Sequence, residues 1–526
     1  MTSNITATEL FHRVAYIATA TEVKPATLNK LMHETLVLTC AAGLAGTPDA
    51  IGSLFAKVDV LCKLKRIGVN DYFDIQKMRH DSNSAAPLQR EELLYDCRAL
   101  AVLISKVFDT DIPAELIGHI PMSRKPQPSM RHIDRRCVRC IVRAVKGYMV
   151  TVETAQDADQ KMLQVDCSEP RLQYLADLLQ AGTQVNLIDV APQQGQEACQ
   201  VRQVIVEPDF LIDISSLAAC FTPYGHSPFV YTLKRLKEAA NSQAILIGNF
   251  AGSALDDIIN KGEDYDWTVT FKSNFREKAL EYCTCQDLNK QTSFHLEARK
   301  QVENIQKAVD ALFQSTYDRH KAILEPSFVC EQMGLQGRID LMTTDLRLLV
   351  EQKSGKNFSL ETQRSTVHGS MLTEPHYVQL LLYYECLSRN FSLPYNSIDG
   401  RLLYSKYPMP MGLPRATYYR QLIDEAIQLR NQIVTTEFNI ARNGFNSIID
   451  ELDPLALRTQ KVNENFWNNY LYPQLCGVTE HLQDMDPLTH SYFCHMANFV
   501  YREQLASRLG VVEGTGNAAA DLWNMP

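Results

Sequence analysis

Three ionisable side chains lie close together in the stretch GLQGRIDLMTTDLRLLVEQKSGK, which spans residues 334–356. Asp340 follows the run GRI, and Glu351 and Lys353 end the apolar run LRLLV. Two convergent carboxylates form an oxygen-rich site, which is the ligand chemistry that Mg²⁺ and Mn²⁺ prefer. A nearby lysine can orient a metal-bound water and offset negative charge in a transition state. These residue types therefore suit metal-dependent hydrolysis.

The runs GRIDLM and LRLLVEQK are predicted to form an antiparallel hairpin through the polar residues 343–345. Side chains two apart on a strand share a face, so Glu351 and Lys353 point one way and Gln352 the other. Asp340 can then approach Glu351 from the partner strand, and the main-chain carbonyl of Gln352 is a further candidate metal ligand. Burying such charges is costly without a partner or a metal. The alternative is an ordinary surface pair, because an E-x-K triplet alone arises by chance.

A helix predicted after the hairpin, EPHYVQLLLYYECLSRN, carries a third motif. Gln379 and Tyr383 are four residues apart and therefore share one helix face. Taken alone, this pair is typical of core packing. In this order, however, the G-x-x-D, E-x-K and Q-x-x-x-Y motifs resemble the PD-(D/E)XK nuclease superfamily, in its RecB-like branch.

The resemblance covers residues 210–410 and implies a restriction-endonuclease-like α/β nuclease core. It implies a Mg²⁺- or Mn²⁺-dependent deoxyribonuclease, either an exonuclease or a flap or single-strand nuclease. The implied catalytic residues are Asp340, Glu351 and Lys353. Supporting or DNA-binding roles are implied for three more residues: Gln379, Tyr383 and Arg338.

The sequence departs from the family where a histidine or acidic residue usually assists the metal. Gly252, in LIGNFAGSALDDI, occupies that position. Asp256 follows one helical turn later and is the favoured substitute, and His295, beside Glu297, is the second candidate. The alternative for His295 and Glu297 is an ordinary solvated position on a long charged helix.

Many members of this branch hold an iron–sulfur cluster, and many work with a superfamily 1 helicase. The cysteines after Gln379 are far apart, and the close upstream pair lacks partners, so no cluster is expected; these cysteines are Cys386, Cys476, Cys494, Cys283 and Cys285. No G-x-x-x-x-G-K-[ST] phosphate loop occurs, so we expect no ATP site in this chain. The resemblance implies DNA, single-stranded or branched, as substrate and a helicase partner in cis or in trans.

The flanking sequence predicts three further regions in a multidomain α/β protein. Residues 1–125 and 411–526 show helical spacing of apolar residues. Residues 133–208 carry short alternating runs separated by turns, which predicts a small OB-like β-barrel. Its one C-x-x-C, Cys137 and Cys140, lacks the second pair that a structural zinc site needs, so buried thiols are favoured.

The 526-residue chain carries a net charge of −9, which excludes a uniformly basic surface. Nucleic acid would have to bind a local basic groove. The leading edge of the predicted barrel is a candidate, because it carries Arg135, Arg136 and Arg139, with Arg131, Arg143 and Lys146 beside them. A solvated edge that prevents strand aggregation explains the same residues. The N-terminus shows no signal peptide, no apolar run could span a membrane, and the scattered cysteines favour a cytoplasmic location.

We therefore expect a DNA nuclease that acts in repair, recombination or defence. The alternatives are a catalytically degenerate nuclease fold that binds DNA for a helicase, and a scaffold that recruits partners. Intact Asp340, Glu351 and Lys353 favour the nuclease, whereas Gly252 favours the degenerate module.

Overall fold

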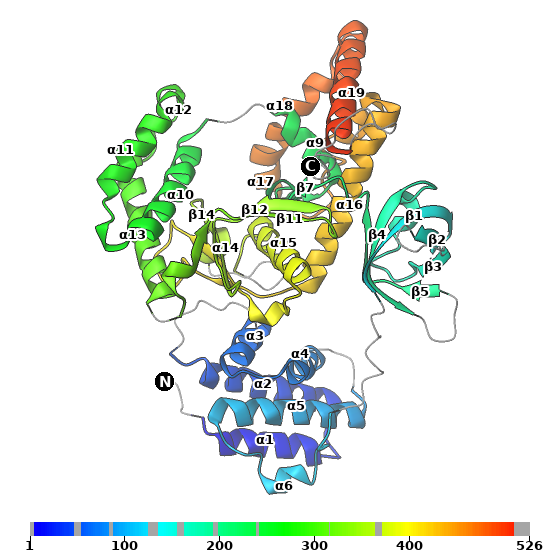
Figure 1. Cartoon of the computed structure of the whole chain (residues 1–526). Helices are drawn as coiled ribbons and strands as arrows, with labels where there is room; N and C mark the ends of the chain where they lie inside the picture. The colour runs from blue at the N-terminus through cyan, green and yellow to red at the C-terminus, as the bar shows by residue number, and fades with distance from the viewer. Residues whose placement is uncertain are drawn as a thin grey trace, which may run out of the picture. The chain divides into compact units, whose positions relative to one another are not determined.

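The computed structural model is a mixed α/β protein (Figure 1). It describes residues 5–46, 54–83, 88–124, 135–154, 162–192, 198–237, 241–314, 316–362 and 371–509. The chain forms two compact units. The first comprises Met1–Met130, Lys356–Thr373 and Tyr407–Thr417, and the second comprises Arg131–Gly355, Glu374–Lys406 and Tyr418–Pro526. No helix within the described ranges is both long and apolar enough to cross a membrane.

The first unit is helical, as the sequence predicts for its N-terminal part. Its helices are α1 (Ala7–Thr19), α2 (Pro25–Gly43), α3 (Leu54–Leu64), α4 (Val69–Ser82), α5 (Arg90–Phe108), α6 (Ala114–Ile117) and α14 (Phe358–Thr362). Thr6 and Glu9 start α1 with a reciprocal capping box. The apolar stripes of α1, α2 and α5 pack into one core that includes Leu10, Leu36 and Leu100.

The second unit begins with a six-stranded sheet. Its strands are β1 (Arg135–Lys146), β2 (Met149–Thr154), β3 (Met162–Asp166), β4 (Gln184–Pro192), β5 (Ala198–Gln200) and β6 (Gln203–Val206), with α7 (Leu175–Leu178) between β3 and β4. β1 pairs with both β2 and β4, β3 pairs with β2 and β5, and β4 also pairs with β5 and β6. Alternate valines such as Val138, Val150 and Val152 point into its core, as the two-residue period predicts.

The central sheet of the second unit holds the predicted hairpin. In order, four of its strands are β10 (Ala322–Leu324), β13 (Leu341–Thr343), β14 (Leu348–Lys353) and β15 (Asp399–Tyr404). β13 and β14 are antiparallel, with Leu341 opposite Val350, which confirms the hairpin. The first three residues of β14 are fully buried, as expected for a strand covered on both faces.

The prediction that GRIDLM forms one continuous strand is wrong. Residues 335–338 form β12 (Leu335–Arg338), which pairs with β11 (Ser327–Cys330) and with β7 (Ile212–Asp213) in a separate sheet. β13 begins only at Leu341, so Ile339 and Asp340 join two sheets. The Asp340 carbonyl accepts a hydrogen bond from the Glu325 N–H at 2.9 Å, which anchors this joint.

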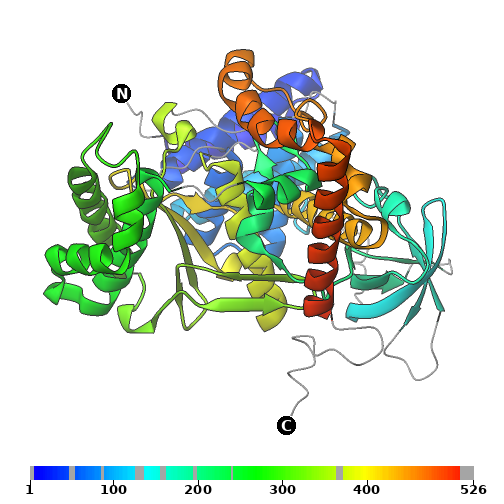
Figure 2. The same cartoon turned by 90° about the horizontal axis from the view of Figure 1, so that it is seen from above.

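Helices complete the second unit. The longer ones are α9 (Pro228–Leu236), α10 (Gln243–Lys261), α11 (Trp267–Glu277), α13 (Phe294–Phe313), α15 (Glu374–Phe391), α16 (Arg420–Asn443), α18 (Tyr472–Gln483) and α19 (Pro487–Leu509). The short elements are α8 (Ile214–Ala218), α12 (Ala279–Thr284), α17 (Glu464–Phe466), β8 (Phe221–Thr222) and β9 (Gly225–His226). α10 and α13 pack on each other, and α10 to α13 form the green group of helices in both views (Figures 1 and 2).

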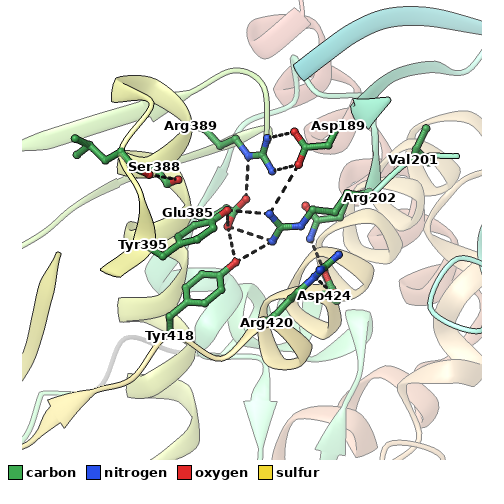
Figure 3. A network of polar contacts seen from close by, with 12 residues as sticks. Asp189, Val201, Arg202, Glu385, Ser388, Arg389, Tyr395, Tyr418, Arg420 and Asp424 are labelled. Carbon is green, nitrogen blue, oxygen red and sulfur yellow. Dashed lines mark hydrogen bonds and ion pairs between the residues drawn. The ribbon is translucent and has the colours of Figure 1, made fainter. Parts of the chain in front are cut away.

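A buried ionic network joins the six-stranded sheet to α15 (Figure 3). Arg389 donates two 2.7 Å hydrogen bonds to the Asp189 carboxylate and a 3.0 Å bond to Glu385. Arg202 lies 3.5 Å from Glu385 and donates to the hydroxyls of Tyr395 and Tyr418 at 2.8 and 2.9 Å. The Glu385 side chain is completely buried, so the loss of one partner would leave a charge uncompensated.

We therefore expect Arg389→Met to lower the free energy of unfolding by about 3–5 kcal/mol, because Asp189 and Glu385 would both lose their main partner. Urea denaturation monitored by circular dichroism measures this change. Arg299→Met is the matched control, because Arg299 pairs with Glu303 on an exposed helix face and such pairs contribute little. Equal, small effects of the two substitutions would contradict a stabilising role for the network.

Candidate active site

Glu351 is the buried centre of the predicted site. Its residue is 3% exposed, and one carboxylate oxygen accepts hydrogen bonds from Lys353 Nζ at 2.8 Å and from Gln379 Nε2 at 2.7 Å. The other oxygen, Oε2, is buried and has no hydrogen-bond partner among the described residues. Burial, followed by the nearby charge of Asp340, raises the pKa of Glu351 to about 8, although Lys353 and Gln379 oppose the shift.

Asp340 lies beside the end of β14. Its Oδ2 accepts a hydrogen bond from the Gln352 N–H at 2.6 Å. The N–H and C=O of one strand residue point to the same edge, so the Gln352 carbonyl also faces the Asp340 side, beyond the last paired residues of β13. The Lys353 carbonyl faces the opposite edge, where it accepts from the Ser405 N–H at 3.0 Å. Burial is the main cause that raises the pKa of Asp340.

Asp256, the favoured substitute for the missing metal-assisting residue, interacts electrostatically with Asp340. It is half-buried on α10. Burial raises its pKa to about 6, and the charges of Glu325 and Asp340 add to the shift. Sequence reasoning did not select Glu325, which pairs with Arg338 at 3.1 Å on the exposed side of the joint. Its N–H bond to the Asp340 carbonyl joins residues 15 apart, and no local pattern marks such a contact.

The structure places His295 in different surroundings. Its ring lies 4.9 Å from the Trp267 ring and 5.6 Å from the Phe271 ring, so it packs against α11. Between these two candidates, the electrostatic contacts with Asp340 therefore favour Asp256 as the third carboxylate. His295 contacts aromatic rings because α11 packs beside the start of α13, and the sequence of α13 alone does not reveal this packing.

Helix α15 contacts two parts of the site, one through Gln379 and the other through Tyr383. Gln379 Nε2 donates to Ser215 Oγ at 2.9 Å as well as to Glu351. The Tyr383 hydroxyl donates to the Arg338 carbonyl at 2.5 Å. A Cβ on Gly337 would lie 3.0 Å from that hydroxyl, so glycine permits this close approach. The Arg338 side chain itself is 61% exposed.

His376 is a site residue that the sequence analysis missed. It lies one turn before Gln379 on α15, and its Nδ1 is 3.2 Å from the Tyr404 hydroxyl. Burial, followed by the charge of Lys353, lowers its pKa to about 3, so the imidazole is neutral at physiological pH. The i, i+3 spacing from Gln379 was the available signal.

The donor atoms around Glu351 can be compared with what a divalent metal needs. Among the described residues, no group of three or more His, Cys, Asp or Glu side chains is arranged to hold a metal ion by itself. Mg²⁺, however, often binds through one or two carboxylates and keeps several waters. Glu351 Oε2, Asp340 and the Gln352 carbonyl match that donor set, and the buried, unpaired Oε2 is the strongest indication.

Three arginines on the predicted basic edge have partners inside the protein. Arg136 donates to Ser392 Oγ at 2.6 Å, Arg139 forms an ion pair with Asp209, and Arg143 forms one with Glu153. The side chain of Arg135 and all of Arg131 lie outside the described residues. The ion pairs partly neutralise the charges of Arg139 and Arg143. These two residues would therefore attract DNA phosphates less strongly than the sequence suggests.

The cysteines considered for zinc or iron form no disulfide: Cys137, Cys140, Cys283, Cys285, Cys386, Cys476 and Cys494. Cys140, Cys167, Cys199, Cys285 and Cys386 are buried. Burial raises the pKa of Cys167 to about 12, so this thiol is protonated at physiological pH.

Comparison with known proteins adds no relative: no protein-family model matches the chain, and no curated protein matches it.

The raised pKa of Glu351 predicts a pH-dependent stability in a metal-chelating buffer. Between pH 4.5 and about pH 8 the unfolded chain loses a proton that the native state keeps. Stability from this group therefore falls as pH rises, by at most about 1.4 kcal/mol per pH unit. Glu351→Gln removes the titration. We therefore expect the melting temperature of Glu351→Gln minus that of wild type to increase from pH 5 to pH 8.

Thermal denaturation at several pH values measures this difference, with Glu303→Gln as the control on an exposed helix face. A constant offset between Glu351→Gln and wild type across this range would contradict the raised pKa.

Proposed function

We propose that this protein is a metal-dependent nuclease that hydrolyses DNA phosphodiesters at Asp340, Glu351 and Lys353. One observation carries the proposal: Glu351 is buried at a strand end with one oxygen held by Lys353 and Gln379 and the other unpaired. A purely structural carboxylate would normally have both oxygens hydrogen-bonded. An unpaired oxygen beside a second carboxylate is suited to a bound cation.

Each side chain has a distinct role in this mechanism. Asp340, Glu351 and the Gln352 carbonyl would hold a divalent metal, which lowers the pKa of bound water and neutralises phosphate charge. Lys353 is 22% exposed beside Glu351, and its ammonium can donate a hydrogen bond to the attacking water or to a phosphate oxygen. Gln379 fixes the orientation of Glu351, and Tyr383 fixes the joint that carries Asp340.

The arrangement of elements supports membership of the PD-(D/E)XK superfamily. An antiparallel hairpin, the helix that follows it and a parallel third strand place the three motifs around one carboxylate. In the six-stranded sheet, strand pairings run from β1 through β2, β3, β5 and β4 back to β1, which supports a small OB-like barrel. Within this proposal, a superfamily 1 helicase supplies the motor, and the helical first unit is a docking module.

A degenerate module that binds DNA without cutting it is the second candidate. The absence of a three-ligand metal cluster from the described residues favours it. In that case Lys353 would simply neutralise Glu351, as an internal ion pair does.

Cleavage assays separate the two functions. We expect wild-type protein to cut single-stranded, flap or duplex DNA with Mg²⁺ or Mn²⁺, and Asp340→Ala, Glu351→Ala and Lys353→Ala to lose about 100-fold or more of the rate. Glu303→Ala is the control for an exposed carboxylate.

Thermal melting with Mn²⁺ tests the assigned roles. The metal should stabilise wild type and Lys353→Ala, by about 2.7 kcal/mol at a hundredfold excess over Kd, and Asp340→Ala much less. If wild type cuts no nucleic acid with either metal and its melting is unaffected by Mn²⁺, the nuclease proposal fails.

A further inference from the structure

Helices α11, α12 and α13 surround a cavity of about 550 Å³, here called the aromatic pocket. Its rings come from Phe271, Phe275, Tyr282, Phe294 and His295. The pocket is also lined by the polar side chains of Asn289, Gln291, Thr292 and Ser293. This composition resembles a binding site for flat, polar-edged groups more than it resembles a packing defect.

Part of the aromatic lining is accessible to a ligand. Phe275 is 47% exposed, and its ring lies 5.0 Å from that of Tyr282. His295 is exposed, and its ring packs edge-on against the rings of Trp267 and Phe271. Deeper in the cluster, Tyr282 donates to Asn274 Oδ1 at 2.8 Å, so its ring is held in place. Phe275 and His295 are therefore exposed rings on a rigid base.

A second cavity of about 350 Å³, here called the lysine pocket, adjoins the first. The two pockets share Thr292 and Ser293, and the second is also lined by Lys300, Gln301 and Lys406. Lys406 lies 4.0 Å from Glu297, and both side chains are about 30% exposed, so this contact leaves the lysine charge accessible to a ligand.

The lysine pocket lies close to the candidate active site. Gln301 Nε2 donates to the carbonyl of Ser354, the residue after Lys353, at 3.0 Å. Lys406 follows Ser405, whose N–H bonds to the Lys353 carbonyl. The order along the surface is thus aromatic pocket, lysine pocket, then Lys353.

The segment that forms the aromatic pocket carries a small excess of positive charge. Between Trp267 and Lys300 there are six Lys and Arg and four Asp and Glu, whereas the whole chain carries −9. The cations beside the rings that matter for the argument are Lys300 and Lys406, which line the lysine pocket.

We propose that the aromatic pocket binds bases of single-stranded nucleic acid, whose phosphates pass Lys300 and Lys406 towards Lys353. Aromatic rings next to cations bind single strands regardless of sequence, because every base has a stackable face. A duplex keeps its bases stacked internally and cannot use these rings. Along α13, His295 and Lys300 are about 8 Å apart, the length of two or three stacked bases. This proposal deepens the nuclease proposal by naming its substrate class.

Binding is measured in a metal-chelating buffer, so that no cleavage is needed. The probes are 2-aminopurine-labelled oligodeoxynucleotides and oligoribonucleotides, read by anisotropy and by quenching of the base on stacking. Of the two probes, DNA and RNA, the one that wild type binds more tightly is used for the comparison. We expect Phe275→Ala to bind this probe about fivefold or more weakly than wild type, and to lose the quenching of 2-aminopurine. Phe275→Trp should retain both, and blunt duplex affinity should not change.

Phe499→Ala is the matched control, because Phe499 is also an exposed phenylalanine and lies on α19, outside the pocket. Its single-strand affinity should equal that of wild type. The double variant Lys300→Gln with Lys406→Gln should reduce the slope of log affinity against log salt by about 1.4, since each phosphate contact on a single strand contributes about 0.7.

Unchanged affinity and quenching in folded Phe275→Ala and His295→Ala would overturn this inference, even if DNA cleavage is observed. Conversely, ring-dependent binding without cleavage in Mg²⁺ or Mn²⁺ would support the pocket and reject the proposed nuclease. Circular dichroism of each variant verifies that the fold is intact.

Discussion

The burial of one carboxylate at the end of a strand is the constraint on which the rest of the site depends. Glu351 follows three completely buried residues of β14, so it leaves water together with them. Among the described residues, Lys353 and Gln379 reduce the cost of moving a charge into this environment, and both bond to the same oxygen of Glu351. The native state therefore favours a protonated Glu351 when no cation is present, and a cation would favour the ionised form.

Helix α15 transmits this constraint to the rest of the second unit. Its start carries His376 and Gln379 at the site, and Tyr383 at its centre holds the Arg338 carbonyl. Further along the same helix, Glu385 and Arg389 join it to the six-stranded sheet through buried ion pairs. The site and the predicted barrel are thus attached to the same helix. A displacement of one end of α15 would therefore also move the other end.

The hairpin, the faces of its side chains and the helix pair could all be predicted from the sequence, because they follow local periods. A two-residue period places Glu351 and Lys353 together, and a four-residue spacing places Gln379 and Tyr383 on one face. The expectation of a single GRIDLM strand was wrong, since local β-pattern does not reveal that Ile339 and Asp340 join two sheets. The surroundings of His295 could not be predicted either, because its neighbour Trp267 belongs to another helix.

The sequence by itself determined which residue types could do chemistry and which of them share a strand or helix face, because backbone periodicity is a local property. Only the tertiary structure decided which candidates meet in space. It brought the charge of Asp256 close to Asp340, left Glu351 Oε2 unpaired, and gave Arg139 an acidic partner in Asp209. These contacts join residues that are 70 or more apart or depend on burial, and neither property follows from spacing along the chain.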